Sequence, residues 1–347
     1  MSIAPAAGAK PLCPVFGICG GCAYQDLPYE EELRLKAQNL KSLLQDLLKL
    51  EDRAFGPVVP SPEPYHYRSR LDLTLKRSRT GEPQLGFQLA GTHRMIETGS
   101  CAIARREISD FIPELKRLAS AKLPENYDLA NLTVRTGDGG KVFWGGIGRR
   151  SLEMKEEDYF WTEIRGRRIF YSLETFFQAN LSILPSLIET IRAFGVLDRQ
   201  TRFLDLYAGV GLFGFSFSEE VKRVTLIEES KASLKLARFN AAYHRFENLE
   251  IVEGKVELHL AEMAPALAGE KTVAMIDPPR KGLSGAVRES LAAMKNLSAL
   301  IYLSCGPETL ARDLEFFRDS GWKITQVIPF DFFPKTAHLE TLVLLTP

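Results

Sequence analysis

The second half of the chain alternates short apolar strands with helical stretches, and this alternation restricts the fold more than any other feature. Strand-like apolar runs lie at 203–207, 224–228, 249–253, 272–277 and 299–304. Strands that alternate with helices imply a mostly parallel, doubly wound sheet. The last two strands, near 322–330 and 339–345, lack a long connection between them. We therefore expect an antiparallel pair at the end of the sheet.

The chain has 347 residues, which suits two or three domains, and its pattern changes twice. Residues 1–56 combine a small, Pro-containing arm at 1–12, a stretch with three cysteines, and leucines at helical spacing. Residues 57–172 follow a Pro-rich linker and alternate like strands around one helix, so we expect a smaller α+β domain there. Residues 173–347 form the α/β domain with the large sheet.

The composition limits the partners and the location. Lys plus Arg and Asp plus Glu are each 44, so any binding to a nucleic acid must depend on local basic patches. No apolar run approaches the roughly 18 residues that suggest a membrane span. The N-terminus has neither a basic start nor an apolar core of a signal peptide. We therefore expect a cytoplasmic protein that does not enter a membrane.

A glycine-rich turn follows the strand at 203–207. Gly209, Gly211 and Gly214 have the G-x-G-x-x-G spacing, which lets a backbone turn sharply and approach a nucleotide. Glu228 ends the next strand, where a carboxylate can accept hydrogen bonds from ribose hydroxyls. The spacing alone fits a structural turn, a nicotinamide cofactor or S-adenosylmethionine.

Two acidic positions favour S-adenosylmethionine. Asp205 lies on the strand just before the turn, where it can support the amino-acid end of the ligand. Asp277 opens the D-P-P-R sequence at the end of another core strand, and the two prolines fix the backbone there. We therefore expect a substrate base and a methyl donor to meet beside Asp277, although such a sequence can also be a plain strand-ending turn.

Cys305 and Glu340 are the candidate reactive groups. Cys305 follows the strand at 299–304 and precedes a helix, so it lies at the ligand edge of the sheet, where a thiolate is favoured. Glu340 enters an apolar strand, where burial should raise the pKa of a carboxyl and suit it to be a general base. The alternatives are an inert buried thiol and a solvated edge-strand glutamate.

These motifs together resemble the RNA 5-methyluridine methyltransferases that carry an iron–sulfur cluster. The resemblance spans Cys13 to Leu345. Its motifs are FFQAN, DLYAGVG, DPPRKG, YLSCGPETLARDL and DFFPKTAHLE. It implies the seven-stranded, Rossmann-like sheet of S-adenosylmethionine-dependent methyltransferases, with a smaller α+β middle domain and an N-terminal cluster-binding segment.

The resemblance also implies residue roles. Cys305 would be the nucleophile that adds to carbon 6 of uracil, and Glu340 the base that removes the proton from carbon 5. The positions that match S-adenosylmethionine-binding residues are Gln178, Tyr207, Glu228 and Asp277. Leu212 and Lys255 depart from the pattern, since some members have Asn there.

The likeness to the shorter members, which have no N-terminal β-barrel, favours 23S ribosomal RNA over transfer RNA as the substrate. We also expect a monomer. Two rivals are a nicotinamide-dependent oxidoreductase and an RNA-binding or assembly factor with a degenerate methyltransferase domain.

Four of the five cysteines are candidate metal ligands. Cys13, Cys19 and Cys22 form a triplet, and Cys101 is the remaining cysteine besides Cys305. Four thiolates suit zinc or an iron–sulfur cluster, and a triplet with one distant partner fits a cluster better than paired knuckles do. The resemblance implies a 4Fe-4S cluster, for which we expect a structural or RNA-positioning role.

Basic side chains gather in three places that could contact phosphates, and unpaired bases could stack on nearby tyrosines. Each group could equally be a solvated strand face. A base attacked at carbon 6 must be unpaired or flipped, so we expect a loop or single-stranded target. The three groups are His66, Arg68, Arg70, Lys76, Arg77 and Arg79; Arg149 and Arg150; and Arg165, Arg167 and Arg168.

Overall fold

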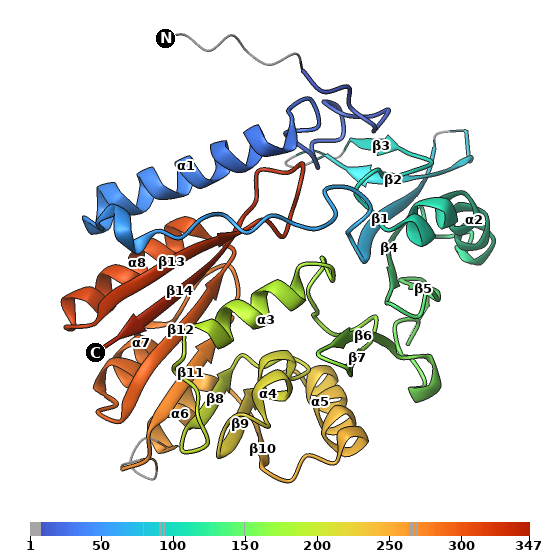
Figure 1. The fold of residues 1–347 in the computed structure, drawn as a ribbon. Helices are drawn as coiled ribbons and strands as arrows, with labels where there is room; N and C mark the ends of the chain where they lie inside the picture. The colour runs from blue at the N-terminus through green and yellow to red at the C-terminus, as the bar shows by residue number, and fades with distance from the viewer. Residues whose placement is uncertain are drawn as a thin grey trace, which may run out of the picture.

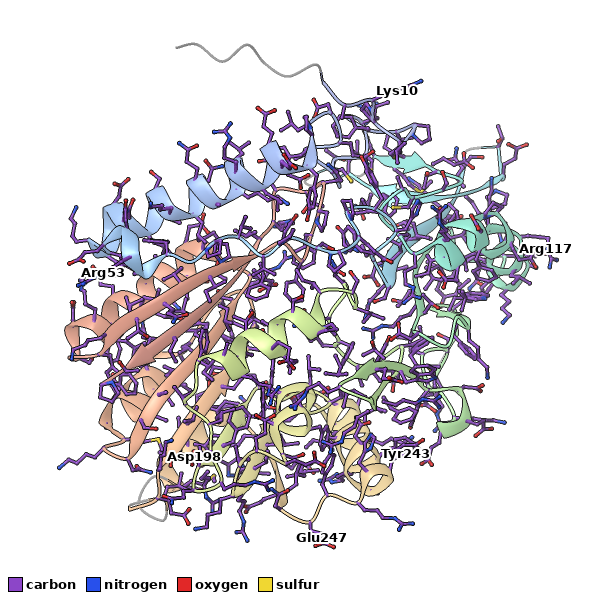
Figure 2. The ribbon with its side chains drawn as sticks, in the orientation of Figure 1. Lys10, Arg53, Arg117, Asp198, Tyr243 and Glu247 are labelled. Carbon is purple, nitrogen blue, oxygen red and sulfur yellow. The ribbon has the colours of Figure 1, made fainter. Side chains whose placement is uncertain are left out.

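The computed structural model describes residues 8–347 except 79, 90, 91, 93, 149, 264–266 and 268. The first seven residues of the expected N-terminal arm therefore lie outside the described residues, and so do Ala90 and Gly91, a pair that is typical of a turn. Figure 1 shows a large sheet flanked by helices, with a smaller sheet to one side. The side chains in Figure 2 fill the layers between the sheets and their helices.

The large sheet has seven strands in the order β10-β9-β8-β11-β12-β14-β13. Its strands pair in parallel from β10 to β12, whereas β14 pairs antiparallel with both β12 and β13. This confirms the parallel sheet with an antiparallel end. The strands are β8 (Arg202–Leu206), β9 (Arg223–Glu228), β10 (Leu249–Glu253), β11 (Thr272–Ile276), β12 (Leu297–Ser304), β13 (Lys323–Phe330) and β14 (Glu340–Thr346).

Helices cover both faces of this sheet because successive strand residues point to opposite sides. Phe203 joins the core beneath α3 (Leu184–Ala193), α4 (Leu212–Phe217) and α5 (Lys231–His244), whereas Leu204 joins the core on the other face. That second core contains residues of α1 (Tyr29–Leu48), α6 (Val256–Met263), α7 (Gly285–Ala293) and α8 (Pro307–Asp319). No helix was expected from the sequence at the position of α6.

The smaller sheet is antiparallel, in the order β3-β2-β1-β4-β5, and α2 (Arg106–Lys122) packs on it. The hairpin β6-β7 connects it to the large sheet, since Phe160 and Phe170 join the core under α3 and α4. The strands are β1 (Arg70–Arg77), β2 (Pro83–Gln88), β3 (Met95–Glu97), β4 (Leu129–Thr136), β5 (Val142–Gly145), β6 (Phe160–Ile164) and β7 (Arg167–Tyr171).

The N-terminal helix packs far from its neighbours in sequence. In Figure 1, α1 runs beside α8, which belongs to the C-terminal part of the chain. Leu40, Leu44 and Leu48 bury its inner face in the core on that side of the sheet. The segment that leads into the Pro-rich linker then runs alongside β13, and bridges join Phe55 to Val327 and Val59 to Phe330. Among the described residues, none of the helices is both long and apolar enough to span a membrane.

Candidate active site

The glycine-rich turn between β8 and α4 needs glycine for steric reasons. Gly211 has a φ of 92°, and a Cβ there would lie 2.3 Å from the ring of Phe215. A Cβ on Gly214 would lie 2.3 Å from a methyl carbon of Leu226 on β9. The turn and the first residues of α4 are therefore packed closely against each other and against β9.

Two carboxylates hold this turn in place. Asp205 is buried and accepts a hydrogen bond from the Gly214 N–H at 2.8 Å. Glu228 accepts hydrogen bonds from the N–H groups of Gly209, at 2.8 Å, and Ser230, at 2.7 Å. Each Glu228 oxygen keeps a second lone pair, so the carboxylate could still accept ribose hydroxyls. Asp205, which we expected to support the ligand directly, uses one oxygen to fix the turn.

Burial raises the pKa of Asp205 well above its ordinary value, and the charges of Asp277 and Glu228 add to that effect. Tyr207 follows Asp205 in the left-handed backbone region, with a φ of 61°. A tyrosine rarely adopts this conformation, so the local packing must hold it there. Burial also raises the pKa of the half-buried Tyr207 hydroxyl.

Gln178 and Asp277 meet at the centre of the sheet edge. The buried Gln178 amide donates a hydrogen bond to Asp277 Oδ2 at 3.0 Å, from a loop 99 residues earlier in the chain. Burial raises the pKa of Asp277 to about 7, and the hydrogen bond from Gln178 opposes this rise. The two side chains therefore lie together at this edge of the sheet.

The loop that carries Gln178 is fixed by Arg135, which sequence reasoning missed. Arg135 belongs to β4, is fully buried, and donates hydrogen bonds of 2.7, 2.7 and 3.0 Å to the carbonyls of Ser172, Thr175 and Phe177. Its guanidinium also lies over the ring of Tyr171. Burial lowers the pKa of Arg135 to about 10. The smaller sheet therefore positions a loop of the large one.

Cys305 and Glu340 lie at the same end of neighbouring strands. The β12–β14 register ends with Ser304 opposite Thr341, so the next residues outward, Cys305 and Glu340, lie at the same edge of the sheet. Glu340 is buried, and its Oε2 has no hydrogen-bond partner among the described residues. Burial raises the pKa of Glu340 well above its ordinary value, and the charge of Asp277 raises it further.

Cys305 is half-buried, and burial raises the pKa of its thiol. The nearby charges of Glu340 and Asp277 raise the pKa further, whereas Arg280 lowers it. Arg280 also lowers the pKa of Glu340. Sequence reasoning noted Arg280 only as part of the D-P-P-R motif. Its loop is held by α8, because the Thr309 hydroxyl donates to the Arg280 carbonyl at 3.1 Å.

A cavity of about 560 Å³ opens beside Cys305. Its walls come from the start of α8, from the segment before β14, and from α1, which was not expected to approach this site. Glu340 and Asp277 do not line it, so the cavity reaches Cys305 from the α1 side. The lining includes Tyr24, Lys36, Asn39, Arg280, Cys305, Thr309 and His338.

Comparisons with known proteins agree with this geometry. The sequence profile described as tRNA (Uracil-5-)-methyltransferase matches residues 149–347. The chain belongs to this family. It is therefore an RNA methyltransferase of the uracil-5 type. Membership of this family decides against the alternative function of a nicotinamide-dependent oxidoreductase, which the glycine spacing also allowed.

Similar proteins cover nearly the whole chain. An uncharacterized RNA methyltransferase of Thermosynechococcus vestitus is 28% identical over 97% of this chain and 84% of its own. One of Aquifex aeolicus is 25% identical over 99% and 85%. The solved structure of the Pyrococcus abyssi tRNA (uracil-54, C5)-methyltransferase has a TM-score of 0.71, 20% identity, and coverage of 94% and 86%. That likeness supports the methyltransferase fold.

The four remaining cysteines of this family member are neighbours. Cys101 is buried, Cys13, Cys19 and Cys22 are half-buried, and all are free thiols. The pKa of Cys22 rises to about 11, mainly through burial and also through the charges of Cys101, Cys13 and Cys19. Within the described ranges, however, no three or more His, Cys, Asp or Glu side chains form a group that could hold a metal ion.

The basic groups have different surroundings. Arg70 pairs with Asp72, and Arg77 donates to the carbonyls of Leu123 and Tyr127, whereas Lys76 is exposed. Arg79 and Arg149 lie outside the described residues.

In the third group, Arg165 pairs with Glu220, Arg167 pairs with Glu219, and Arg168 lies over the ring of Trp161. This group is therefore largely neutralised by acidic neighbours. The two positions that depart from the family pattern differ in exposure, because Leu212 is buried at the start of α4 and Lys255 is exposed.

Proposed function

We propose that this protein methylates carbon 5 of a uracil in RNA through a covalent adduct on Cys305, with Glu340 as the base that removes the proton from carbon 5. The observation that carries this proposal is the placement of Cys305 and Glu340 at matching ends of β12 and β14. The charge of Glu340 raises the pKa of Cys305, which supports the closeness of the two side chains. A thiol and an unpartnered buried carboxyl are the two groups that the reaction requires.

In the proposed reaction, the Cys305 thiolate adds to carbon 6 of the uracil. The electron pair of the C5–C6 double bond then forms an enolate across carbon 5, carbon 4 and the oxygen on carbon 4. Carbon 5 then takes the methyl group from the sulfonium of the donor. Glu340 removes the hydrogen that remains on carbon 5, and the electron pair reforms the C5–C6 double bond as the C6–S bond breaks. Arg280 favours the thiolate, since its positive charge lowers the pKa of Cys305.

The methyl donor, S-adenosylmethionine, would lie across the carboxyl ends of β8, β9 and β11. We propose that Glu228 receives its ribose hydroxyls, while Gln178, Tyr207 and Asp277 complete its surroundings. The hydrogen bond between Gln178 and Asp277, and the backbone contacts of Glu228, support preorganised side chains at these positions.

A trapping experiment tests the covalent step. RNA that contains 5-fluorouracil has no proton at carbon 5, so the adduct should persist and survive denaturing electrophoresis. The Cys305→Ala variant should give no such band and no methylated RNA. Full methylation by Cys305→Ala would disprove the covalent mechanism, and retained binding of S-adenosylhomocysteine would show that the variant is folded.

We also propose that Cys13, Cys19, Cys22 and Cys101 hold a 4Fe-4S cluster, which would join the N-terminal segment to the smaller sheet through four iron–thiolate bonds. An orphaned polar atom supports this fit: Gln25 is buried, its Nε2 has no hydrogen-bond partner among the described residues, and it lowers the pKa of the Cys22 thiol. A coordinated thiolate would accept this N–H.

Anaerobically purified protein tests the cluster directly. It should absorb in the visible range and contain iron and sulfide, and the Cys101→Ser variant should lose both signals. A colourless protein with stoichiometric zinc would contradict the proposal.

For the substrate, we propose ribosomal RNA. Transfer RNA is the second candidate, since the matching family and the similar Pyrococcus abyssi enzyme are both described by a tRNA activity. We place the RNA on residues 57–172, with exposed Lys76 among the contacts, and propose a cytoplasmic monomer. Mapping of 5-methyluridine in both RNA classes from cells without the gene would decide between them.

A further inference from the structure

A buried network of four charges joins α1 to the segment before β14. We define it by Glu32, Lys36, Asp331 and Lys335. Lys36 Nζ lies 2.8 Å from Glu32 Oε1 and 2.8 Å from Asp331 Oδ1, and Lys335 Nζ lies 3.1 Å from Glu32 Oε2. The side chains are between 0% and 4% exposed. Two lysines and two carboxylates leave this buried charge network neutral.

The same residues also hold the backbone of both segments. Lys36 donates to the Phe333 carbonyl at 3.0 Å, and the Lys335 N–H donates to Glu32 at 2.6 Å. The Lys335 carbonyl accepts hydrogen bonds from the N–H groups of Ala23, at 2.8 Å, and Tyr24, at 3.1 Å. The segment after Cys22 is therefore fixed directly to the residues that lead into Glu340.

The network borders the cavity beside Cys305. Lys36 and Tyr24 line that cavity from the α1 side, and His338 lines it from the segment before β14. Lys335 has a φ of 67°, a conformation that a lysine adopts only under constraint. Its Nζ lies 5.2 Å from the ring centre of Tyr29 and 5.4 Å from that of Tyr65. The turn before Glu340 and β14 is thus held in place by the contacts of Lys335 with α1 and with Tyr65.

Stability alone does not explain such an arrangement. Buried charges lose their hydration, so apolar side chains of similar size often stabilise a protein as well as a buried ion pair does. What ion pairs and charge-assisted hydrogen bonds supply in addition is a fixed geometry. Here that geometry relates the segment 331–339 to α1, on the opposite wall of the Cys305 cavity.

We propose that the buried charge network positions Glu340 for proton removal, so that Lys36 and Lys335 are positioning residues for the last step of the reaction. This inference rests on the proposed function, because it assigns that step to Glu340. A shift of the segment 331–339 would leave Cys305 and the donor site in place, since these are held by β12, α8 and the turn after β8. Adduct formation and methyl transfer should then continue while proton removal slows.

The variant Lys36→Met/Asp331→Asn tests this proposal without leaving an unpaired charge. On ordinary substrate RNA it should accumulate a denaturation-resistant methylated adduct, because a misplacement of about 1 Å can slow a step by ~100-fold. Its rate of adduct formation should change little. A general loss of folded protein would instead lower both rates together. Lys41→Met is the matched control, because Lys41 lies on the same helix as Lys36 and forms an exposed pair with Asp52 beyond the end of that helix.

If the double variant does not fold, as judged by tryptophan fluorescence, Asp331→Glu decides. This variant keeps the negative charge and the ion pair with Lys36, but its side chain at position 331 is longer. It should therefore also accumulate the adduct. Unchanged release of methylated RNA by a folded variant would overturn the proposal. The failure of the wild-type protein to form an adduct with 5-fluorouracil RNA would instead overturn the proposed function.

Discussion

Replacement of Asp277 by Asn should make the protein more stable at neutral pH, and the gain should shrink as the pH falls. Burial raises the pKa of Asp277 from 3.8 to about 7. Between these values the unfolded chain is ionised while the folded chain keeps its proton. The folded state of the wild-type protein therefore loses stability as the pH rises from 3.8 to about 7, and the loss stays constant above that range.

The magnitude follows from the shift. Each pKa unit corresponds to about 1.4 kcal/mol, so a shift of about three units costs the wild-type protein up to ~4 kcal/mol above pH 7. Part of this cost is already present at pH 5, and the difference in unfolding free energy between Asp277→Asn and the wild type should grow by about 2–3 kcal/mol between pH 5 and pH 8. Partial exposure of Asp277 makes this an upper value.

Urea unfolding, followed by tryptophan fluorescence at several pH values, measures this difference. The matched control is Asp198→Asn, a surface position in Figure 2 where an ion pair with Lys271 lowers the pKa to about 2. Ionised Asp198 stabilises the folded state above pH 3.8, so its replacement should give a constant loss between pH 5 and pH 8. Parallel pH profiles for Asp277→Asn and the wild type would refute the reasoning.

Three further predictions concern separate parts of the site. Glu340→Gln should slow release of methylated RNA by roughly 10²–10⁴-fold and accumulate the adduct on denaturing gels, and normal turnover would exclude Glu340 as the base. Gly214→Ala should lower the unfolding free energy by about 1–3 kcal/mol, because its Cβ would overlap Leu226, and unchanged urea unfolding would contradict this packing. Arg135→Met should lower the unfolding free energy by at least ~2 kcal/mol, because it leaves the buried carbonyls of Thr175 and Phe177 without a hydrogen bond, whereas the Ser172 carbonyl keeps the Thr175 hydroxyl. It should also weaken S-adenosylhomocysteine binding in calorimetry, and unchanged affinity would show that Arg135 does not position Gln178.

The parallel sheet was predictable because its signals are local. Each core strand is a short apolar run. The turn after β8 is so tight that it requires glycines, and their spacing is visible in the sequence. The antiparallel β14 was also predictable, since a short connection before it excludes a parallel crossover. By contrast, α6 has only two buried residues, Val256 and Leu260, and its charged positions hide the helical period.

The contacts between distant segments could not be predicted. Glu32 and Lys36 have the i, i+4 spacing of an ordinary surface pair, and nothing near them indicates a partner at Asp331. Arg165 and Arg167 look like phosphate ligands, but the fold places Glu220 and Glu219 beside them. The side chains of a single chain reveal their chemistry, whereas pairing partners far along the chain depend on the tertiary structure.

The distance in sequence between α1 and its partners has a consequence for biosynthesis. Lys36 leaves the ribosome early, but Asp331 follows it by 295 residues. Until translation is nearly complete, the N-terminal helix must keep its charges hydrated and its leucine face uncovered. A chain that is truncated before Asp331 cannot form the buried ion pair between Lys36 and Asp331.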